Sequence, residues 1–332
     1  MQILLLGATG LLGHNVLLRL LEGGYEVVAL VRHRDGLRLP QALLSDARLH
    51  IVEGAYSTDT LRDAARPCQA IINCAGTTDM SLLRYSDYVP INVTLCEQVI
   101  QVMEELDIRT LVHVSSANTI GYGNAQHPAT EEADMEAPFT RSFYAQSKRA
   151  AEQMLAWTAM EHPDWHLICL NPGFMVGPYD AKPSSGKLLL AAYGRKMMAI
   201  PSGGKAFVDV RDVAAAAVSA LKKGHSGSRY LLTGQSLTLQ QFYALQAQIC
   251  GYKQRQVGVS DFLLKLLGRV GDLIRFCGCR TQLATRNVRQ LMVTEYYDCS
   301  AAVRDLDFAA SDLEGAIRAF FAWREEHCVT DS

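Results

Sequence analysis

The chain has 332 residues, of which 49% are apolar and 20% charged, and its formal net charge is −2. This length suits one large α/β domain, or a domain with a smaller lobe, and the composition is typical of a soluble globular protein. The near-neutral overall charge supplies no field for holding nucleic acid or anionic lipid.

The sequence predicts neither a membrane span nor a metal site. No apolar run reaches the ~18 residues needed to cross a bilayer, and the N-terminus lacks the basic region of a signal peptide. The nine cysteines and nine histidines show no metal-binding spacing. Several cysteines lie in apolar runs, as buried free thiols do in a reducing compartment. We therefore expect a cytoplasmic protein with no metal, no integral membrane segment and no nucleic-acid partner.

Short apolar runs alternate with helical patterns through the first half of the chain. The runs are continuous in apolar character, which predicts strands covered on both faces and hence a parallel sheet with crossover helices. We expect strands at QILLL (2–6), EVVALV (26–31), RLHIV (48–52), AIINC (70–74), TLVHV (110–114) and HLICL (166–170). Long helical patterns cover about 85–106 and 142–161.

The pattern loosens after Asn171, where a Pro/Gly/Ser-rich loop begins. Helices are expected around 187–196, 210–222 and 239–249, with short strands AFVDV (206–210) and SRYLL (228–232) between them. The fold class is thus α/β, with a doubly wound parallel sheet (Rossmann). We place a dinucleotide-binding domain at 1–175, to which parts of 205–235 return. A smaller, mostly helical substrate-binding lobe at 176–330 would cover the ligand-binding edge of the sheet.

The segment LLLGATGLLGHNV places Gly7, Gly10 and Gly13 directly between the first strand and the first helix. Gly7 suits the tight turn, Gly10 allows backbone to approach a pyrophosphate, and Gly13 allows close packing of helix on strand. A lone glycine motif is weak evidence, but its position at the start of a βα unit supports dinucleotide binding.

The end of the second strand, ALVRHRDG, indicates the choice of cofactor. A carboxylate there would bind the ribose 2′-hydroxyl and repel a 2′-phosphate. This chain has Arg32 and Arg34 instead, either of which can pair with a phosphate. A solvated basic loop is the alternative reading, but we favour NADP(H) over NAD(H).

Tyr144 precedes Lys148 by four residues, so both lie on one face of a helix. A lysine placed there can hold ribose hydroxyls and lower the pKa of the tyrosine from its usual ~10, and the phenol can then exchange the proton that accompanies hydride transfer. Ser115 and Ser116, at the end of the fifth strand, can hold the substrate oxygen. The order of glycine turn, serines and Tyr-x-x-x-Lys favours chemistry over coincidence.

With these motifs in place, the chain resembles the extended branch of the short-chain dehydrogenase/reductase superfamily over nearly its whole length. The resemblance rests on GATGLLG, NCAG (73–76), INVTLCEQVI (91–100), VSSA (114–117), YAQSK (144–148), NPGFMVGP (171–178), FVDVRDVA (207–214) and YYDCSAAVRDLDF (296–308). It implies that Tyr144 is the acid/base, Lys148 its partner and Ser116 the residue that orients the substrate oxygen. Similar proteins often dimerise through two long helices, here 85–106 and 142–161, so a homodimer is a further expectation.

The resemblance also implies the cofactor contacts. The adenosine side would meet Cys74, Ala75 and Gly76, and the nicotinamide end Asn171, Pro172 and Gly173. The complete expected set is Gly7, Thr9, Gly10, Leu11, Leu12, Gly13, Arg32, Ala55, Tyr56, Cys74, Ala75, Gly76, Asn92, Tyr144, Lys148, Asn171, Pro172 and Gly173. Ala55 and Tyr56 stand where the family commonly carries an Asp beside the adenine, so backbone must make that contact or it is lost.

On the substrate side, the motifs of this chain differ from those of nucleotide-sugar enzymes, and the differences indicate another class of substrate. Nucleotide-sugar epimerases and dehydratases of this branch usually show Arg-Pro-x-Asn before the Gly-Pro turn, where this chain has Asn171 and Phe174. The pattern is more similar to the dihydroflavonol-reductase and 3β-hydroxysteroid-dehydrogenase group, which implies a small, largely apolar carbonyl or alcohol substrate. The candidate substrate contacts are Ser115, Thr78, Phe174 and Lys205. Because Lys205 can hold a phosphate, a phosphorylated substrate is not excluded. A nucleotide-sugar epimerase or dehydratase with tightly bound NAD is the alternative, and a cofactor-sensing regulator a third reading.

The segment SDFLLKLLGRVGDLIRFCG (260–278) is strongly amphipathic. We expect a packed helix pair of the second lobe. A lid over the pocket and a helix lying on a membrane surface remain open.

Overall fold

The computed structural model describes residues 1–181 and 184–327. Two residues of the Pro/Gly/Ser-rich loop, and the end of the lobe expected to extend to 330, lie outside the described residues.

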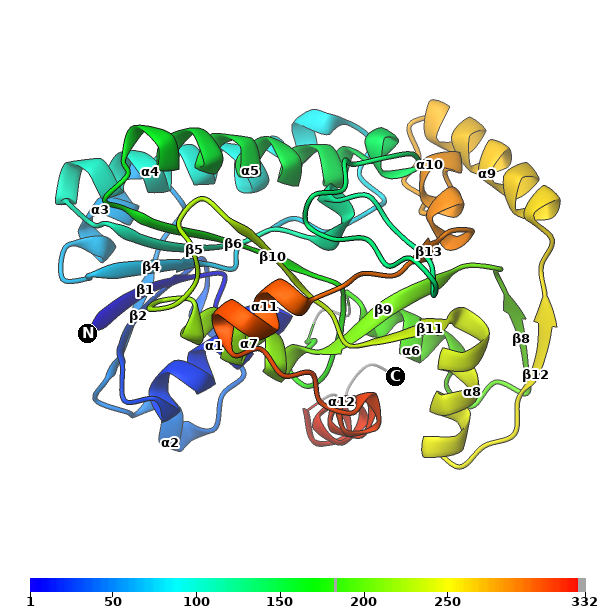
Figure 1. The fold of residues 1–332 in the computed structure, drawn as a ribbon. Helices are drawn as coiled ribbons and strands as arrows, with labels where there is room; N and C mark the ends of the chain where they lie inside the picture. The colour runs from blue at the N-terminus through cyan, green and yellow to red at the C-terminus, as the bar shows by residue number, and fades with distance from the viewer. Residues whose placement is uncertain (182–183, 328–332) are drawn as a thin grey trace.

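Seven parallel strands form the central sheet in the order β10-β6-β5-β4-β1-β2-β3 (Figure 1). They are β1 (Gln2–Leu6), β2 (Glu26–Val31), β3 (Leu49–Glu53), β4 (Ala70–Asn73), β5 (Thr110–Val114), β6 (His166–Pro172) and β10 (Arg229–Leu232). The order reverses between β1 and β4, which creates the crevice where such sheets bind ligands. The predicted doubly wound α/β fold is therefore confirmed.

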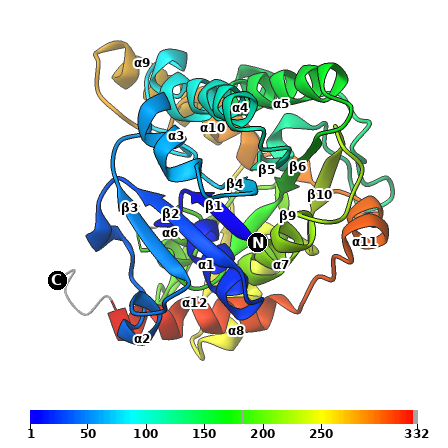
Figure 2. The same cartoon turned by 90° about the vertical axis from the view of Figure 1, so that its left-hand side faces the viewer.

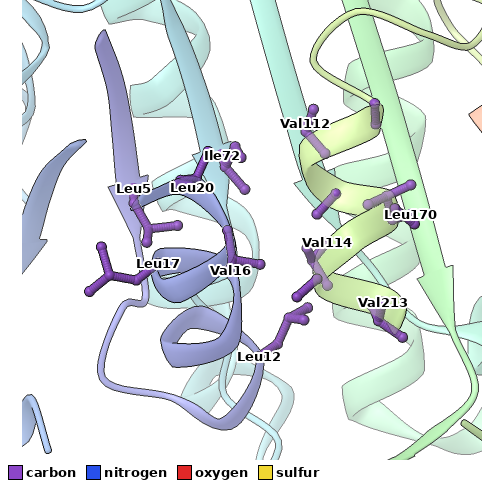
Figure 3. Packing of buried hydrophobic residues seen from close by; sticks show 14 of the residues in the cluster. Leu5, Leu12, Val16, Leu17, Leu20, Ile72, Val112, Val114, Leu170 and Val213 are labelled. Atoms are coloured by element: carbon purple, nitrogen blue, oxygen red, sulfur yellow. The ribbon is translucent and has the colours of Figure 1, made fainter. Parts of the chain in front are cut away.

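Helices cover both faces of the sheet (Figure 2). One face carries α1 (Leu11–Glu22), α7 (Val210–Ser219) and α11 (Ser300–Leu306), and the other carries α3 (Thr58–Ala65), α4 (Leu95–Leu106) and α5 (Phe143–Glu161). Successive β1 side chains point to opposite layers: Leu5 packs with α1 and α7, whereas Leu4 and Leu6 pack toward α3 and α4. Figure 3 shows the first of these cores, in which Leu12 and Val16 of α1 lie near Val213 of α7. Because both faces are buried, the strands had to be apolar throughout.

The region after β6 builds smaller sheets and further helices. Its strands are β7 (Phe174–Val176), β8 (Met197–Ile200), β9 (Gly204–Asp209), β11 (Gln235–Thr238), β12 (Arg255–Gly258) and β13 (Thr294–Glu295). Its helices are α6 (Gly186–Ala192), α8 (Leu239–Ile249), α9 (Asp261–Phe276), α10 (Thr285–Val288) and α12 (Leu313–His327). A separate apolar core, centred on the stacked rings of Phe207 and Phe242, holds β9 to α8.

Short helical segments complete the chain: η1 (Arg34–Gly36), α2 (Gln41–Leu44), η2 (Tyr85–Asp87), η3 (Pro90–Thr94), η4 (Ala117–Thr119), η5 (Phe139–Arg141) and η6 (Arg289–Leu291). The helix expected over 85–106 is interrupted: α4 begins only at Leu95, after the π-helical turn η3. Pro90 has no N–H to continue a regular helix, and the side chain of Asn92 bonds outside it.

The amphipathic segment 260–278 forms one continuous helix, α9, where a helix pair was expected. Only Leu264, Gly268 and Gly271 are buried, and they face the neighbouring α10 region. None of the helices in the described ranges is both long and apolar enough to span a bilayer.

Candidate active site

Two of the three glycines between β1 and α1 are required by the protein's own packing. Gly7 has φ +79, and a Cβ there would lie 2.6 Å from the Cys74 carbonyl carbon and the Ala75 nitrogen. A Cβ at Gly13 would lie 1.9 Å from the Gly7 oxygen. Both positions therefore exclude side chains so that α1 can start close to β1 and β4.

Gly10 has a different environment, because no protein atom crowds it. A Cβ there would approach only the Gly7 oxygen, at 3.4 Å, and the backbone is extended with φ −91. Gly10 is the N-cap of α1, and no side chain caps the helix there. The first-turn amides of Leu11 and Leu12, with the helix dipole, suit an anion at this point. The turn fits the pyrophosphate of a dinucleotide.

The expected adenosine side lies beyond this turn. The Tyr56 hydroxyl accepts a hydrogen bond from the Gly7 amide at 3.1 Å, and Ala55 beside it is exposed. Burial raises the pKa of Tyr56, and the nearby Arg32 charge opposes that shift. Thr9 packs against Gly36, where a Cβ would lie 2.9 Å from its methyl group. Tyr56 therefore contacts the glycine turn, and the Arg32 charge lies near Tyr56.

Tyr144 and Ser116 are brought together from α5 and the end of β5. Helix α5 begins at Phe143, and the Ser142 hydroxyl caps it by accepting from the Ala145 amide at 3.4 Å. The Ser116 side chain lies close enough to the Tyr144 phenol to lower its pKa, but burial raises that pKa more. The phenol therefore retains its proton at neutral pH.

Lys148 lies one turn further along the same face of α5. It is buried, and its Nζ donates to the Val114 carbonyl at 2.9 Å. A Cβ at Gly76 would lie 3.0 Å from this Nζ, so the glycine keeps the space beside the ammonium group clear. We expected Lys148 to lower the pKa of Tyr144. Instead, burial dominates the phenol, and the Lys148 hydrogen bond goes to backbone.

Ser115 carries an unsatisfied group at the end of β5. The side chain is buried, and its hydroxyl has no hydrogen-bond partner among the described residues. Since buried hydroxyls are normally paired, this one indicates a group bound from outside the chain. Together with the uncrowded backbone at Gly10, it makes the residues present compatible with a dinucleotide and a substrate oxygen.

Glu152 is a buried residue behind the site that the sequence analysis missed. Its carboxylate accepts from the Thr119 hydroxyl at 2.6 Å and from the Asn171 amide, which also donates to the Ser116 carbonyl at 3.1 Å. Arg149 pairs with it at 3.2 Å. The spacing Tyr144, Lys148, Glu152 repeats every four residues, so the helix face itself was the available signal. Asn171 thus uses its side chain to anchor the Ser116 segment.

Asn92 connects the loop after β4 to α5. Its side chain accepts from the Thr77 amide at 2.7 Å, donates to the Thr77 carbonyl at 3.1 Å, and donates to the Ser147 hydroxyl at 2.9 Å. Ser147 in turn donates to the Tyr144 carbonyl at 2.7 Å. Asn92 was expected at the cofactor, and its bonds here position the loop that carries Gly76 and the exposed Thr78.

The expected substrate residues Phe174 and Lys205 lie on β7 and β9 and already have partners. Phe174 packs edge-to-face on Phe207, and Lys205 lies over the Phe174 ring and pairs with the buried Glu295. The register of β13 against β9 places Glu295 directly opposite Lys205. This pair corrects the expectation that Lys205 is free to hold a phosphate, because Glu295 already offsets its charge.

Pro172 and Gly173 lie where β6 ends. Pro172 is paired with Leu232 in the sheet, and the Gly173 amide donates to the Leu232 carbonyl at 3.0 Å. A Cβ at Gly173 would lie 2.5 Å from the Ala206 oxygen. The close packing of β9 therefore explains by itself why residue 173 is a glycine, and no cofactor contact is needed to explain it.

Arginines from the C-terminal region line a pocket next to α5, which the sequence analysis did not anticipate. The pocket has a volume of about 350 Å³ and is lined by Leu83, Pro138, Arg141, Phe143, Asp272, Arg275, Ala284, Thr285, Arg286 and Arg289. Arg286 stacks on the Phe143 ring at 4.1 Å. Arg275 and Arg286 also donate to the Leu82 carbonyl. The loop after β4 is therefore held by residues about 200 positions away in sequence.

The described part of the chain contains no cluster of three or more His, Cys, Asp or Glu side chains suited to a metal ion. Its cysteines are free thiols, and burial raises the pKa of Cys74 to about 12. Cys74 is therefore a neutral thiol beside the glycine turn.

Comparison with known proteins agrees with this geometry. The family described as "NAD dependent epimerase/dehydratase family" matches residues 3–232. The chain is 28% identical over 327 residues to a putative dihydroflavonol 4-reductase of Synechocystis sp., covering 97% of this chain and 94% of that protein. It is 27% identical to sterol demethylase protein B of Methylococcus capsulatus, covering 98% and 99% of the two chains.

Solved structures share the fold. UDP-glucuronic acid 4-epimerase from Bacillus cereus, in complex with UDP-glucuronic acid and NAD, superposes with a TM-score of 0.76 at 15% identity, covering 98% of this chain and 99% of the other. The matches confirm the resemblance drawn from the sequence motifs. This chain therefore belongs to the NAD-dependent epimerase/dehydratase family, within the extended short-chain dehydrogenases/reductases, and is an enzyme of the kind that works with NAD(H) or NADP(H).

Proposed function

We propose that this protein is an NADP(H)-dependent oxidoreductase that interconverts a carbonyl and an alcohol on a small, largely apolar substrate. The observation that carries the proposal is the proximity of the Tyr144 phenol to the Ser116 side chain, with Lys148 one helical turn away beside Gly76. A bound nicotinamide would supply or accept the hydride. The side chains of the protein supply the proton and the orientation.

Tyr144 is suited to donate a proton. Burial raises the pKa of its phenol, so the hydroxyl is protonated at neutral pH and can protonate the oxygen of a carbonyl as that carbonyl is reduced. Ser116 would hold the same oxygen, and the Ser115 hydroxyl is an additional unpaired group at the end of β5. In alcohol oxidation the same oxygen would accept the proton instead.

NADP(H) is favoured over NAD(H) because of Arg32, one of two neighbouring arginines after β2. Arg34 donates to the Ile51 carbonyl at 2.7 Å and is committed to the protein. Arg32 is exposed, forms no hydrogen bond or ion pair with any described residue, and lies near Tyr56 at the glycine turn. A free guanidinium at this point matches a 2′-phosphate.

An apolar substrate is supported by the residues around the site and by the relatives. Lys205 is neutralised by Glu295 and does not present an anion site. Two relatives matched over nearly their whole length are named for a dihydroflavonol and a sterol, which are both ring compounds without a phosphate.

The experiment is a substrate panel read by the absorbance of the reduced nicotinamide. Purified protein with NADPH should reduce apolar ketones or aldehydes. Tyr144→Phe should lower kcat by a factor of roughly 10² to 10⁴, the usual contribution of a general acid, and leave NADP+ binding nearly unchanged. If turnover is unchanged in Tyr144→Phe, Tyr144 is not the proton donor.

One observation favours the alternative, a nucleotide-sugar epimerase or dehydratase. Arg141, Arg275, Arg286 and Arg289 surround the pocket and form a cationic wall that can hold a diphosphate. That enzyme would copurify with NAD and convert UDP-sugars without added cofactor. Activity of this kind in the same panel, with no reduction of ketones, would replace the proposed function.

A further inference from the structure

Helix α9 presents an apolar face that the rest of the described protein leaves uncovered. It lies at the periphery of the molecule beside α10 (Figure 1). Its exposed apolar side chains recur at helical spacing along one side, and Phe262, Leu273 and Phe276 are 78%, 65% and 89% exposed. The other members are Leu263, Leu266, Leu267, Val270 and Ile274. We call these eight residues the α9 face.

The orientation of this face is set by the opposite side of the helix. A Cβ at Gly271 would lie 2.0 Å from the Leu283 oxygen, and one at Gly268 would lie 2.9 Å from the Thr285 Cα. The glycine side of α9 is therefore in direct backbone contact with residues 283–285. The helix cannot turn its apolar side inward without breaking this contact, which argues against its serving as a lid that folds over the pocket.

The charge around α9 departs from that of the whole chain. Residues 253–289 contain eight lysines and arginines and two acidic residues, whereas the complete chain has a formal net charge of −2. None of these eight basic side chains forms an ion pair with any described carboxylate. Lys265 and Arg269 are exposed and lie one turn apart, along a stripe next to the α9 face. The near-neutral total therefore hides a strongly basic patch.

We propose that the α9 face seats in the interface of an anionic lipid bilayer. An apolar stripe bordered by lysine and arginine is the arrangement by which interfacial helices bind: the apolar side enters the headgroup region and the basic side chains reach the anionic lipids. A second copy of this chain fits the same face less well. Two such faces in contact would bring together two patches with eight basic residues and only two acidic residues each, which repel one another.

The docked helix would also lie next to the substrate side of the enzyme. Arg275, at the end of α9, donates to the Ser81 carbonyl at 3.1 Å and to the Leu82 carbonyl, on the loop that follows β4. Asn287 donates to the Met80 carbonyl at 2.9 Å. The bilayer would then adjoin the pocket that Arg275 lines beside α5, and the value of this position for an apolar substrate rests on the proposed function.

The test is sedimentation of the full-length protein with vesicles. We compare phosphatidylcholine alone with phosphatidylcholine containing about one third phosphatidylserine, at low and at high salt. The protein should sediment with the anionic vesicles, less with neutral ones, and less at high salt because the charges are then screened. Lys265→Gln with Arg269→Gln should weaken binding by about fivefold for each charge removed. Leu266→Ser with Leu273→Ser should weaken it by roughly tenfold for each side chain.

A matched control removes apolar surface elsewhere. Trp157 and Met160 of α5 are 66% and 73% exposed, and Trp157→Ser with Met160→Ser should bind vesicles as the unchanged protein does. The proposal is overturned if the unchanged protein stays in the supernatant with anionic vesicles, or if the α9 variants sediment equally well. It is also overturned if Leu266→Ser with Leu273→Ser converts a dimer to a monomer in light scattering, because the face would then belong to a second copy.

Failure of the docking can be told apart from failure of the proposed function. Tyr144→Phe should bind vesicles normally while losing turnover, and the α9 variants should reduce a small water-soluble ketone normally while losing vesicle binding.

Discussion

Two glycines of the first turn have different reasons to be glycine: one is needed for packing within the protein, and the other is proposed to leave room for the cofactor. Gly10 and Gly13 lie three residues apart, yet a methyl group would meet nothing closer than 3.4 Å at Gly10 and would approach the Gly7 oxygen to 1.9 Å at Gly13. We therefore predict opposite phenotypes for the substitutions Gly10→Ala and Gly13→Ala.

The stabilities of the two variants follow from these contacts. Gly10 has backbone angles that alanine adopts readily, so Gly10→Ala should change the free energy of unfolding by less than about 1 kcal/mol. Gly13→Ala must push α1 away from the turn and should cost about 3 kcal/mol, the upper end for an overpacked site. For a chain of 332 residues this corresponds to a fall in Tm of roughly 4 °C.

The cofactor effect has the reverse order. At a concentration of 100 Kd, NADP+ stabilises the native state by about 2.7 kcal/mol, which raises the Tm of a chain this long by roughly 4 °C. A methyl group at Gly10 in the path of the pyrophosphate should cost about 2 kcal/mol of binding. Affinity then falls about thirtyfold, and the Tm rise at the same NADP+ concentration shrinks to roughly 1 °C.

The assay is thermal unfolding of each variant with and without NADP+ at one fixed concentration. A full Tm rise in Gly10→Ala would refute the placement of the pyrophosphate at this turn. A loss of stability in Gly10→Ala as large as that in Gly13→Ala would show that Gly10, too, serves packing.

Three further predictions concern charges in and near the site. Arg32→Ser should weaken NADP+ binding about tenfold or more and leave the affinity for NAD+ unchanged. Arg34→Ser should weaken NADP+ binding less, because Arg34 is bonded to backbone. Equal losses of NADP+ affinity in titrations of the two variants would contradict the role of Arg32. Glu152→Ala should cost about 3 kcal/mol in urea unfolding because it leaves buried partners unpaired, while Arg149→Ala, at the more exposed end of the pair, should cost less than about 1 kcal/mol. Burial lowers the pKa of His14 to about 4. The unfolded chain therefore binds the proton first as pH falls through the ordinary ~6.5, and His14 by itself should contribute a loss of about 2 kcal/mol in stability between pH 8 and pH 5. His14→Gln does not titrate and should show that much less pH dependence, and an unchanged pH profile would show that His14 is not the group responsible.

The sequence alone was sufficient for the sheet and the motifs. The first six strands lie within about two residues of their predicted bounds. Each strand is an apolar run that is buried on both faces, and the run stops where the chain leaves the sheet. The glycine turn and the pair Tyr144 and Lys148 are likewise local: their spacing decides which atoms can meet, and no distant segment is needed to recognise them.

The tertiary structure decided everything that depends on pairing between distant segments. Lys205 looked free in sequence, but the register of β13 on β9 brings Glu295 to it from 90 positions away. The loop after β4 is held by Arg275 and Arg286 from the far end of the chain.

The burial of individual side chains also could not be predicted from the sequence. Local spacing suggested that Lys148 would lower the pKa of Tyr144, whereas the surroundings of the phenol raise it. The amphipathic pattern at 260–278 predicted a helix, but which side would be covered depended on the glycines that meet residues 283–285. Spacing along the chain determines which side chains share a face. Only the packing of distant segments determines what that face meets, and desolvation and charge pairing follow from that contact.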